Sequence, residues 1–293
     1  MDARFSPVIR NAMTVDVEEH FQVSAFERYI DRGDWDSYPS RVEGNTRKIL
    51  DLFAEHNVHA TFFILGWIAE KYAPLIRCIL DAGHEVASHG YSHIRVTEQN
   101  QMQFQEDVTR TKKILEDACG QQVYGYRAAS FSIGRDNLWA LDSLEQAGYL
   151  YSSSINPVRH DLYGMPEAPR FKFRYRDRGL LEIPISTIRL FKQNMPCGGG
   201  GYFRLFPYKY FRWAISNINT EEKKSSVFYF HPWELDPGQP RVEGLDLKTR
   251  FRHYNNLSRM EGRLRILLNE FAWGRMDHLF LDKASENASP GIA

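Results

Sequence analysis

The feature that most constrains the fold is an alternation of short apolar runs and longer amphipathic segments along the 293-residue chain. Short aromatic and aliphatic runs are typical of buried strands, and apolar residues at helical spacing are typical of helices. Because strands and helices alternate, the order predicts parallel strands with crossover helices. The expected strands cover residues 12–17, 60–66, 85–88, 124–129, 149–155, 181–186 and 226–230. The expected helices cover residues 42–55, 69–82 with a break at Pro74, 101–118, 137–147, 207–219 and 255–271.

Polar residues of the kinds used in catalysis stand at the ends of four expected strands. They are Asp16, His89, Arg127 and His231, each from a separate strand. In a barrel of parallel strands the carboxyl ends converge on one rim, and that rim holds the active site. Any one of these residues could be there by chance, but all four together predict a functional site at this rim.

Two of the candidate metal ligands, His89 and His93, are four residues apart. Imidazole is the commonest metal ligand because it is mostly neutral near pH 7 and keeps a free lone pair. The spacing lets both rings approach one ion from one side of a turn. The alternative is a pair of ordinary polar residues on a surface turn, since H-x-x-x-H is a cheap match. A catalytic metal also needs a third ligand, which we expect to be a carboxylate.

The best source of that carboxylate is the segment 14–20, where acidic residues follow a short apolar run. Asp16 and Glu18 are two residues apart, so both can lie on one face of a strand and reach the rim. Glu19 and His20 are rivals, and Asp16 itself could bind the metal. For Glu19 the simpler interpretation is a solvated acid, because charged side chains are mostly exposed.

The composition excludes several classes of protein. The 37 basic residues balance 37 acidic ones, so no excess positive charge points to nucleic acid or anionic lipid. The apolar runs are too short to span a bilayer, and the first residues carry no signal-peptide core. The three cysteines are widely spaced, which fits neither a disulfide framework nor a C-x-x-C zinc site. We therefore expect a cytoplasmic protein with no nucleic-acid partner.

Five stretches, in order along the chain, resemble the motifs of the polysaccharide deacetylase family (carbohydrate esterase family 4). They are Thr14-Val15-Asp16-Val17-Glu18, Ser88-His89-Gly90-Tyr91-Ser92-His93, Tyr126-Arg127-Ala128-Ala129-Ser130-Phe131, Gly148-Tyr149-Leu150-Tyr151-Ser152-Ser153-Ser154-Ile155 and Tyr229-Phe230-His231. The run 197–204, together with His231-Pro232-Trp233-Glu234, resembles the branch found in bacterial exopolysaccharide gene clusters.

The resemblance implies a distorted (β/α)7-type barrel that removes N-acetyl groups from a sugar or glycan, with an exopolysaccharide precursor as the expected substrate. No composition break marks a domain boundary, so we expect one domain over residues 1–282 and a disordered tail over 283–293. The chemistry needs a cation to polarise the amide carbonyl, a base for the attacking water and an acid for the leaving nitrogen.

The resemblance also implies roles for single residues. His89 and His93 would bind the metal, and Asp16 would be the base, with Arg127 paired to it so that it stays ionised. His231 would be the acid, although a lone histidine is more often a hydrogen-bonded core residue. The backbone amide after Arg127 could complete an oxyanion hole with the metal.

The chain departs from the family pattern at two positions. Most members have two adjacent aspartates in the first motif, whereas Val17 follows Asp16 here. A branch of the family uses D-x-D instead, and on that pattern we assign Glu18 as the carboxylate ligand. In the fourth motif Ser152 stands where the family has an aspartate, so it receives no catalytic role.

Aromatic residues near the motifs are candidates for sugar binding. Tyr91, Tyr202 and Trp233 could stack on pyranose rings, although core packing is an equally simple interpretation. The glycines at 198–201 match no phosphate-binding loop, and we expect a flexible loop at the rim.

We expect one divalent ion as cofactor: Zn²⁺ fits the N/O ligand set, and Co²⁺, Ni²⁺ or Fe²⁺ would fit as well. Three other functions remain open. One is another C–N amidohydrolase on the same fold, for example one acting on a ureide. A second is a non-heme iron oxygenase, whose usual H-x-D/E order differs from the order here. The third is a catalytically impaired glycan-binding relative, which the missing aspartates keep open.

Overall fold

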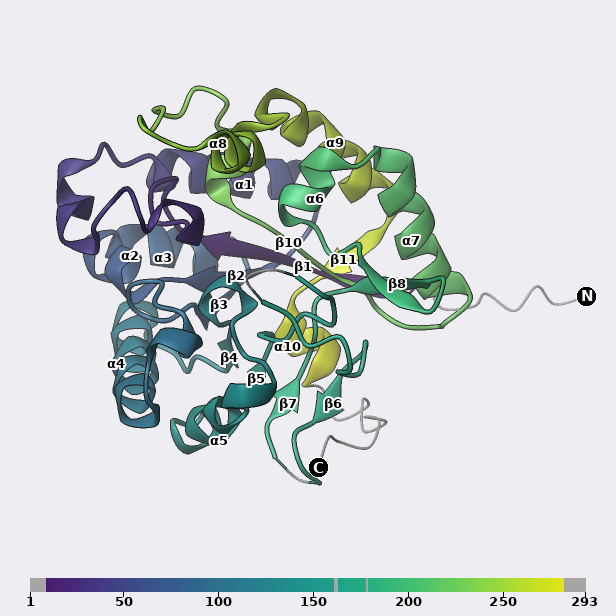
Figure 1. The fold of residues 1–293 in the computed structure, drawn as a ribbon, viewed down its shortest axis with the longest axis horizontal. Coiled ribbons are helices and arrows are strands. Elements are labelled where there is room, and N and C mark those ends of the chain that lie inside the picture. Colours follow the sequence, from purple (N-terminus) through teal and green to yellow (C-terminus); the bar gives the residue numbers. More distant parts are fainter. Residues whose placement is uncertain (1–8, 161–162, 178, 282–293) are drawn as a thin grey trace, which may run out of the picture.

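A curled nine-stranded sheet forms the centre of the molecule in the computed structural model, which describes residues 9–160, 163–177 and 179–281 (Figure 1). The strand order is β10-β1-β2-β3-β4-β5-β7-β6, and β11 also pairs with β1. All pairs are parallel except β6–β7. The strands are β1 Arg10–Val17, β2 Thr61–Ile64, β3 Glu85–Ser88, β4 Gly125–Tyr126, β5 Tyr151–Ser152, β6 Phe173–Arg174, β7 Leu181–Glu182, β10 Val227–Phe230 and β11 Ala272–Gly274.

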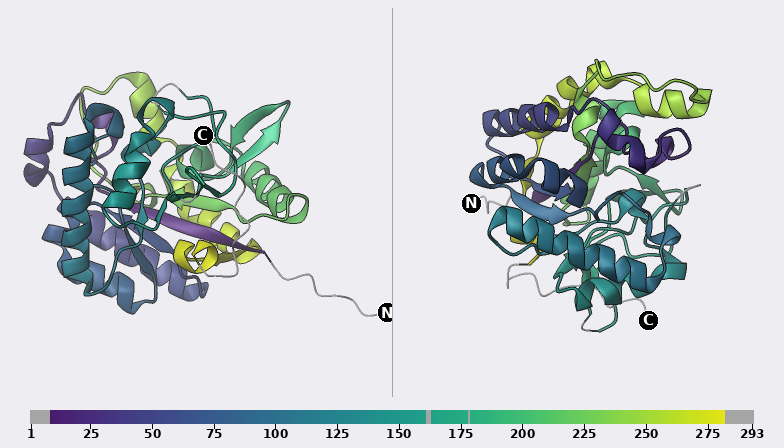
Figure 2. Two further views of the ribbon diagram at one scale, coloured as in Figure 1. Left: turned by 90° about the horizontal axis from the view of Figure 1, so that it is seen from below. Right: turned by 90° about the vertical axis from the view of Figure 1, so that its left-hand side faces the viewer.

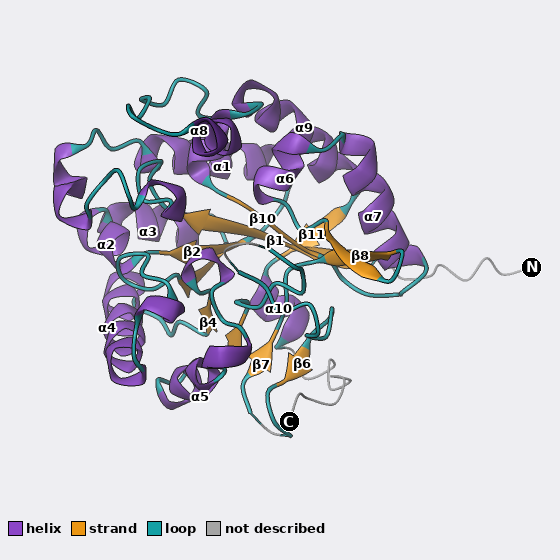
Figure 3. Cartoon of the chain, viewed as in Figure 1, coloured by secondary structure: helices purple, strands orange, loops and turns teal. Residues whose placement is uncertain are grey.

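Helices surround the central strands on most sides, as Figures 2 and 3 show. They are α1 Val42–Glu55, α2 Gly66–Lys71, α3 Ala73–Asp81, α4 Gln101–Cys119, α5 Trp139–Gln146, α6 Gly200–Leu205, α7 Tyr208–Thr220, α8 Leu247–Tyr254, α9 Leu257–Glu270 and α10 Met276–Phe280. The predicted α/β class and distorted-barrel architecture are confirmed, and the sheet has the form of a curled half-barrel. Among the helices of the described ranges, none combines the length with the apolarity that a bilayer span requires.

The two faces of the central strands have different neighbours. On β1, Met13, Val15 and Val17 belong to the large core cluster that also contains residues of the surrounding helices. Ala12, on the other face, belongs to a smaller cluster with Phe63, Tyr229 and other residues. Because side chains alternate along a strand, Asp16 shares the face of this smaller cluster. Asp16, near the carboxyl end of β1, lies on this inner face and lines a pocket there.

Several elements differ from the sequence-based expectation. The expected helix 69–82 is two helices that meet at Tyr72, with Pro74 in the first turn of α3, where proline is tolerated. Strands β4 and β5 are only two residues long because the buried chain beyond them leaves the ladder. The sequence did not predict the hairpin of β8 (Thr187–Leu190) and β9 (Gln193–Pro196). The expected tail 283–293 lies outside the described residues.

The glycine run does not form the flexible loop that we expected. Gly200 begins α6, and Gly199 forms a bridge with Tyr229 of β10. Both have positive φ, 111° and 57° for Gly199 and Gly200. A Cβ on Gly199 would lie 2.1 Å from the Tyr229 carbonyl oxygen, and one on Gly200 would lie 2.3 Å from the Tyr229 hydroxyl. These glycines are therefore needed for the chain to pack against β10.

Candidate metal centre and active site

The register of the sheet brings the predicted site residues to one end. Val17 of β1 pairs with Ile64 of β2, Ile64 pairs with Ser88 of β3, and Ser88 pairs with Tyr126 of β4. The next residues after three of these strands are Glu18, His89 and Arg127. On the other side of β1, Val15 pairs with Phe230, so Asp16 and His231 are the next residues there. The coincidence of strand ends that the sequence predicted is present in the fold.

Glu18, His89 and His93 form a group that can hold a metal ion. One ligand atom from each lies within 4.8 Å of the others, and all three residues are buried. The Nε2 atom of His93 is 3.1 Å from Oε2 of Glu18. The Nδ1 atom of His89 donates to the carbonyl oxygen of Arg127 at 2.8 Å, which leaves Nε2 with its lone pair free.

The donor set and the hydrogen bonding both fit a divalent cation. Oε2 of Glu18 is buried and accepts no hydrogen bond from the described residues. Burial raises the pKa of Glu18 to about 7, against the opposing charge of His231. Burial, together with the neighbouring imidazoles of His89 and His231, holds the pKa of His93 well below its ordinary value. A neutral imidazole pair beside an unsatisfied carboxylate oxygen is the form that a metal needs.

Asp16 lies beside this group and is held by Arg127. Oδ1 of Asp16 accepts from Nη1 of Arg127 at 2.5 Å, and both side chains are buried. Arg127 also donates to Thr14 Oγ1 at 2.8 Å and to Ser153, and its guanidinium lies 4.0 Å from the centre of the Phe63 ring. These contacts fix the arginine, so Asp16 has one oxygen in the ion pair and lines the pocket as well.

His231 closes the group from the side of β10. Its Nε2 atom is 3.3 Å from Oε1 of Glu18, and its Nδ1 atom donates to Oε1 of Glu234 at 2.7 Å. Burial alone would lower the pKa of His231, but the carboxylates of Glu18 and Glu234 outweigh it and raise the pKa to about 9. The indole Nε1 of Trp233 donates to the same Glu18 oxygen at 3.3 Å.

A pocket of about 210 Å³ opens over these residues. Six of the nine predicted site residues line it: Asp16, Glu18, His89, His93, His231 and Trp233. Arg127 contacts Asp16 and is itself completely buried. The wall also includes side chains to which the sequence assigned no role, among them Ser24, Ser130, Tyr163, Tyr229, Arg252 and His253.

Two of the three aromatic residues predicted to stack on sugar rings lie elsewhere. The Tyr91 hydroxyl donates to Glu70 at 2.7 Å, and the Arg110 guanidinium lies over the Tyr91 ring. Tyr91 is not among the residues that line the pocket. Tyr202 packs against Phe206 and lines a different hollow. Trp233 does line the pocket, but its indole stacks on the imidazoles of His231 and His253. Tyr91 and Tyr202 are therefore not in contact with this pocket, and the exposed surface of Trp233 is small.

Glu19, the alternative candidate for the carboxylate ligand, makes contacts with the start of a helix. Glu19 is buried, which contradicts the interpretation as a solvated acid. It accepts from the hydroxyl of Ser40 and from the backbone amides of Arg41 and Val42, at 3.0 Å and 3.1 Å. These amides open α1, so Glu19 satisfies the start of that helix and not a metal. His20 lies beside Glu19 and makes an edge contact with Phe21.

The expected oxyanion donor after Arg127 is already used. The amide of Ala128 donates to Ser154 Oγ at 2.9 Å, so it cannot serve a substrate without breaking this bond. Ser152 also contacts Ser154, through the two hydroxyls at 2.7 Å. Ser152, where the family has an aspartate, therefore belongs to a buried network with Ser154 and the carboxyl group of Glu182.

Sequence reasoning missed Glu234 and Arg204. Glu234 is completely buried and contacts His231, and Nε of Arg204 donates to Glu234 Oε2 at 2.6 Å. A weak signal was present, because Pro232 and Glu234 after His231 follow the pattern of a helix start with a carboxylate at its third residue. Arg204 ends the run 197–204 that resembles the exopolysaccharide branch, but its separation of 30 residues from Glu234 indicated no contact between them.

The fold and the site together define an α/β protein with a buried two-histidine, one-carboxylate group at the carboxyl end of its sheet. Residues 31–151 match the sequence profile of the family described as "Polysaccharide deacetylase", and residues 153–281 match a domain of unknown function (DUF3473). The segment 31–151 is thus similar in sequence to polysaccharide deacetylases.

Curated relatives match shorter segments. A peptidoglycan-N-acetylglucosamine deacetylase of Bacillus cereus is 39% identical over 75 residues, 26% of this chain and 27% of the relative. A chitooligosaccharide deacetylase of Rhizobium leguminosarum bv. trifolii is 32% identical over 113 residues, 39% of this chain and 48% of the relative. The matched segments thus span less than half of either relative.

Solved structures agree over nearly the whole chain. A Mycobacterium smegmatis protein assigned to the polysaccharide deacetylases has a TM-score of 0.65 at 18% identity, covering 97% of this chain and 93% of that one. PuuE allantoinase has a TM-score of 0.57 at 16% identity, covering 92% and 88%. At these identities the likeness shows a shared fold.

Proposed function

We propose that this chain is a metal-dependent hydrolase that removes N-acetyl groups from a glycan. The observation that carries the proposal is the convergence of Glu18, His89 and His93 beside Asp16 and His231 in one pocket. The deacetylase domain over residues 31–151 and the names of the two relatives support a sugar amide as the substrate.

The residues divide the hydrolysis of an amide between them. Asp16 accepts a proton from the attacking water as the general base, and the ion pair with Arg127 holds the carboxylate in its orientation. Hydroxide adds to the acetyl carbonyl carbon. His231, protonated near neutral pH, gives the proton on Nε2 to the departing nitrogen as the C–N bond breaks. The products are acetate and a free amine on the sugar.

Glu18, His89 and His93 would hold the divalent cation, which would polarise the acetyl carbonyl and lower the pKa of a bound water. The N/O donor set favours Zn²⁺, and Co²⁺, Ni²⁺ or Fe²⁺ are compatible with it. Glu18 approaches both His93 and His231, so it lies between the metal side and the acid side of the pocket.

The names of the relatives, and the resemblance of the runs 197–204 and 231–234 to exopolysaccharide-cluster proteins, support one class of glycan as the substrate. We infer an oligosaccharide that contains N-acetylglucosamine, on the way to an exopolysaccharide. The pocket wall contributes hydroxyl groups from Ser24, Ser130 and Tyr163, which suit the hydroxyls of a sugar ring.

Acetate release from chitooligosaccharides tests the proposal. The protein is stripped with a chelator, dialysed, and reloaded with Zn²⁺, Co²⁺ or Ni²⁺ in parallel samples. We expect acetate and free amine in equal amounts from a reloaded sample and none from the stripped one. Binding of the oligosaccharide without acetate under every metal would indicate a glycan-binding relative. Hydrolysis of allantoin in place of the glycan would indicate an amidohydrolase for ureides.

A further inference from the structure

A buried ion pair stands behind His231, on the side away from the metal group. Glu234 lies in the short 3-10 turn Pro232–Leu235 that follows β10. Its Oε1 atom accepts from Nδ1 of His231 at 2.7 Å and from the backbone amide of His231 at 3.1 Å. Its Oε2 atom accepts from Nε of Arg204 at 2.6 Å. Both carboxylate oxygens are therefore used, and none of the Glu234 surface is exposed.

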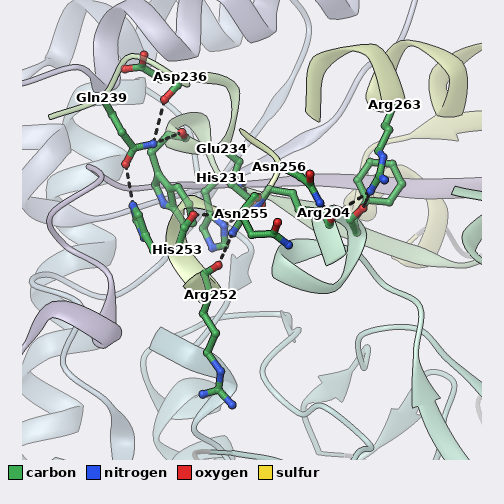
Figure 4. Close-up of polar contacts among 12 residues, drawn as sticks. Arg204, His231, Glu234, Asp236, Gln239, Arg252, His253, Asn255, Asn256 and Arg263 are labelled. Carbon is green, nitrogen blue, oxygen red and sulfur yellow. Dashed lines mark hydrogen bonds and ion pairs between the residues drawn. The ribbon is translucent and has the colours of Figure 1, made fainter. Parts of the chain in front are cut away.

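Arg204 is fixed by the chain around it (Figure 4). It comes from α6 and is 2% exposed. Its other N–H groups donate to three backbone carbonyl oxygens at the C-terminal end of α8. These belong to Arg252 at 3.2 Å, His253 at 2.8 Å and Asn255 at 2.7 Å. A guanidinium with this many backbone acceptors cannot rotate without leaving several of them unsatisfied. The arginine thus holds Glu234 in one place and ties it to two residues of the pocket wall, Arg252 and His253.

The ion pair has a direct consequence for the imidazole. A carboxylate only accepts hydrogen bonds, so Nδ1 of His231 must carry the proton that points at Glu234. Nε2 then faces Glu18 and the pocket. With Glu234 held by Arg204, neither a ring flip nor the other neutral tautomer keeps the 2.7 Å contact.

We propose that Glu234 and Arg204 are positioning residues for the reaction: they fix the ring and the Nδ1 proton of His231 so that Nε2 presents its proton to the leaving nitrogen. The inference rests on the proposed function and adds to it the part of the chain that prepares the acid. In this chain the carboxylate behind the acid comes from the same turn as the histidine, three residues further on, and its counter-ion comes from α6.

The assignment also gives a role to the second half of the chain, which matches a domain of unknown function. Arg204, His231 and Glu234 all lie in it, whereas His89, His93 and Arg127 lie in the half that matches the deacetylase profile. Ser152 contacts the hydroxyl of Ser154 and the carboxyl group of Glu182, and as a serine it supplies no carboxylate to His231.

Two variants test the positioning role. The amide of Glu234→Gln has two orientations. If its NH2 group faces Arg204, two donors meet. If its NH2 group faces His231, Nδ1 must accept a hydrogen bond and therefore cannot carry the proton. Because an unpaired Arg204 can destabilise the fold, the second variant is the double substitution Arg204→Met with Glu234→Gln, which removes both charges. The matched control is Asp236→Asn, two residues further on, whose carboxylate pairs with Arg41.

We expect kcat to fall by about 10- to 100-fold in both variants with KM nearly unchanged, because the interaction acts on the acid and not on substrate binding. Metal content should equal that of the wild type, and Asp236→Asn should keep wild-type kcat. A folded, metal-loaded double variant with wild-type kcat would overturn the proposal, as would a loss confined to KM.

Nitrogen NMR of histidine-labelled protein reports which ring nitrogen of His231 carries the proton. This proton position would not change if Glu234 and Arg204 only stabilised the fold. The His231 signals, identified by their loss in His231→Gln, should show a protonated Nδ1 in the zinc-loaded wild type. In Glu234→Gln the Nδ1 signal should shift toward the unprotonated form. A wild-type His231 with its only proton on Nε2 would overturn the proposal, even if neither variant folds. This reading does not depend on turnover, so a failure of the proposed deacetylase activity is distinguished from a failure of the positioning role.

Discussion

Two buried glutamates at opposite ends of the same sheet differ in how their oxygens are used. Glu85, the first residue of β3, accepts from Tyr151 at 2.9 Å, from Thr61 at 2.5 Å and from the amide of Asp277 at 3.1 Å. Glu18, just beyond β1, accepts one long hydrogen bond from Trp233 on Oε1, and Oε2 has no donor among the described residues.

The comparison shows what marks a functional carboxylate in this fold. Burial raises the pKa of both groups, to about 7 for Glu18 and to about 8 for Glu85, where the charge of Asp277 adds to it. A shifted pKa therefore does not separate the two. The difference lies in the oxygens of Glu85, which all accept hydrogen bonds, and in the imidazoles of His89 and His93, which form a possible metal-binding group with Glu18. One carboxylate is part of the folded structure, and the other is left open for a cation.

The largest expected effect is the loss of the metal in His89→Ala. Without this imidazole only Glu18 and His93 remain, and two ligands do not hold a catalytic metal. We expect turnover to fall to background, since the cation contributes several kcal/mol to transition-state stabilisation. Metal content by mass spectrometry and acetate release are the measurements. His278→Ala, at an exposed position on α10, is the control and should keep both.

Asp16→Asn should separate the base from the ligands. The amide keeps the shape of the side chain but cannot take the proton from water, so we expect a loss of about 10²- to 10⁴-fold in kcat. The metal content should stay at the wild-type level because Glu18, His89 and His93 are unchanged. If the metal is lost instead, Asp16 is a ligand and the roles of Asp16 and Glu18 are exchanged.

The matched pair Glu18→Gln and Glu85→Gln tests the comparison itself. An amide at position 85 would bring an N–H group against existing donors, so we expect a loss of about 1–3 kcal/mol in unfolding free energy with turnover retained. At position 18 we expect the reverse: turnover and metal are lost, while the stability of the metal-free protein changes by less than about 1 kcal/mol. Urea unfolding of the metal-free forms measures both. Equal destabilisation in the two variants would remove the distinction.

The smallest effect concerns His84, near the same end of the sheet as Glu85. Its Nδ1 accepts from the amide of Ala60 at 3.0 Å, and burial lowers its pKa from 6.5 to about 4. The unfolded chain therefore binds the proton more readily between these values, and stability falls as the pH drops through this window. At pH 5.5 the neutral, buried His84 lowers the free energy of unfolding by about 1 kcal/mol relative to pH 7.

The His84→Asn variant keeps an acceptor for the Ala60 amide but cannot titrate. Its unfolding free energy should lose less between pH 7 and pH 5.5 than that of the wild type. An identical pH dependence in the two proteins would show that His84 is not held neutral.

The strand-end residues could be predicted because they depend on local pattern. An apolar run followed by Asp16 and Glu18, by His89, by Arg127 and by His231 is visible in the sequence, and parallel pairing converts strand ends into neighbours. The fold class followed from the same alternation. The bounds of β4 and β5 did not, because the buried chain beyond them makes only isolated backbone hydrogen bonds to its neighbours.

The remaining features depend on tertiary contacts that leave no mark on spacing. The direction in which Tyr91 and Tyr202 point is set by Glu70, Arg110 and Phe206, so aromatic character alone gave the wrong location. Glu19 satisfies the start of a helix that begins 23 residues later. The pairing of Arg204 with Glu234 exists only because α6 packs against the turn after β10.

The most direct test of the account is an anomalous-diffraction map of the zinc-loaded protein, recorded on both sides of the zinc absorption edge. The account predicts one strong peak in contact with Glu18, His89 and His93, with Asp16 and His231 around it but not bound. A peak on other residues, or no peak in protein that has bound zinc in solution, would contradict it.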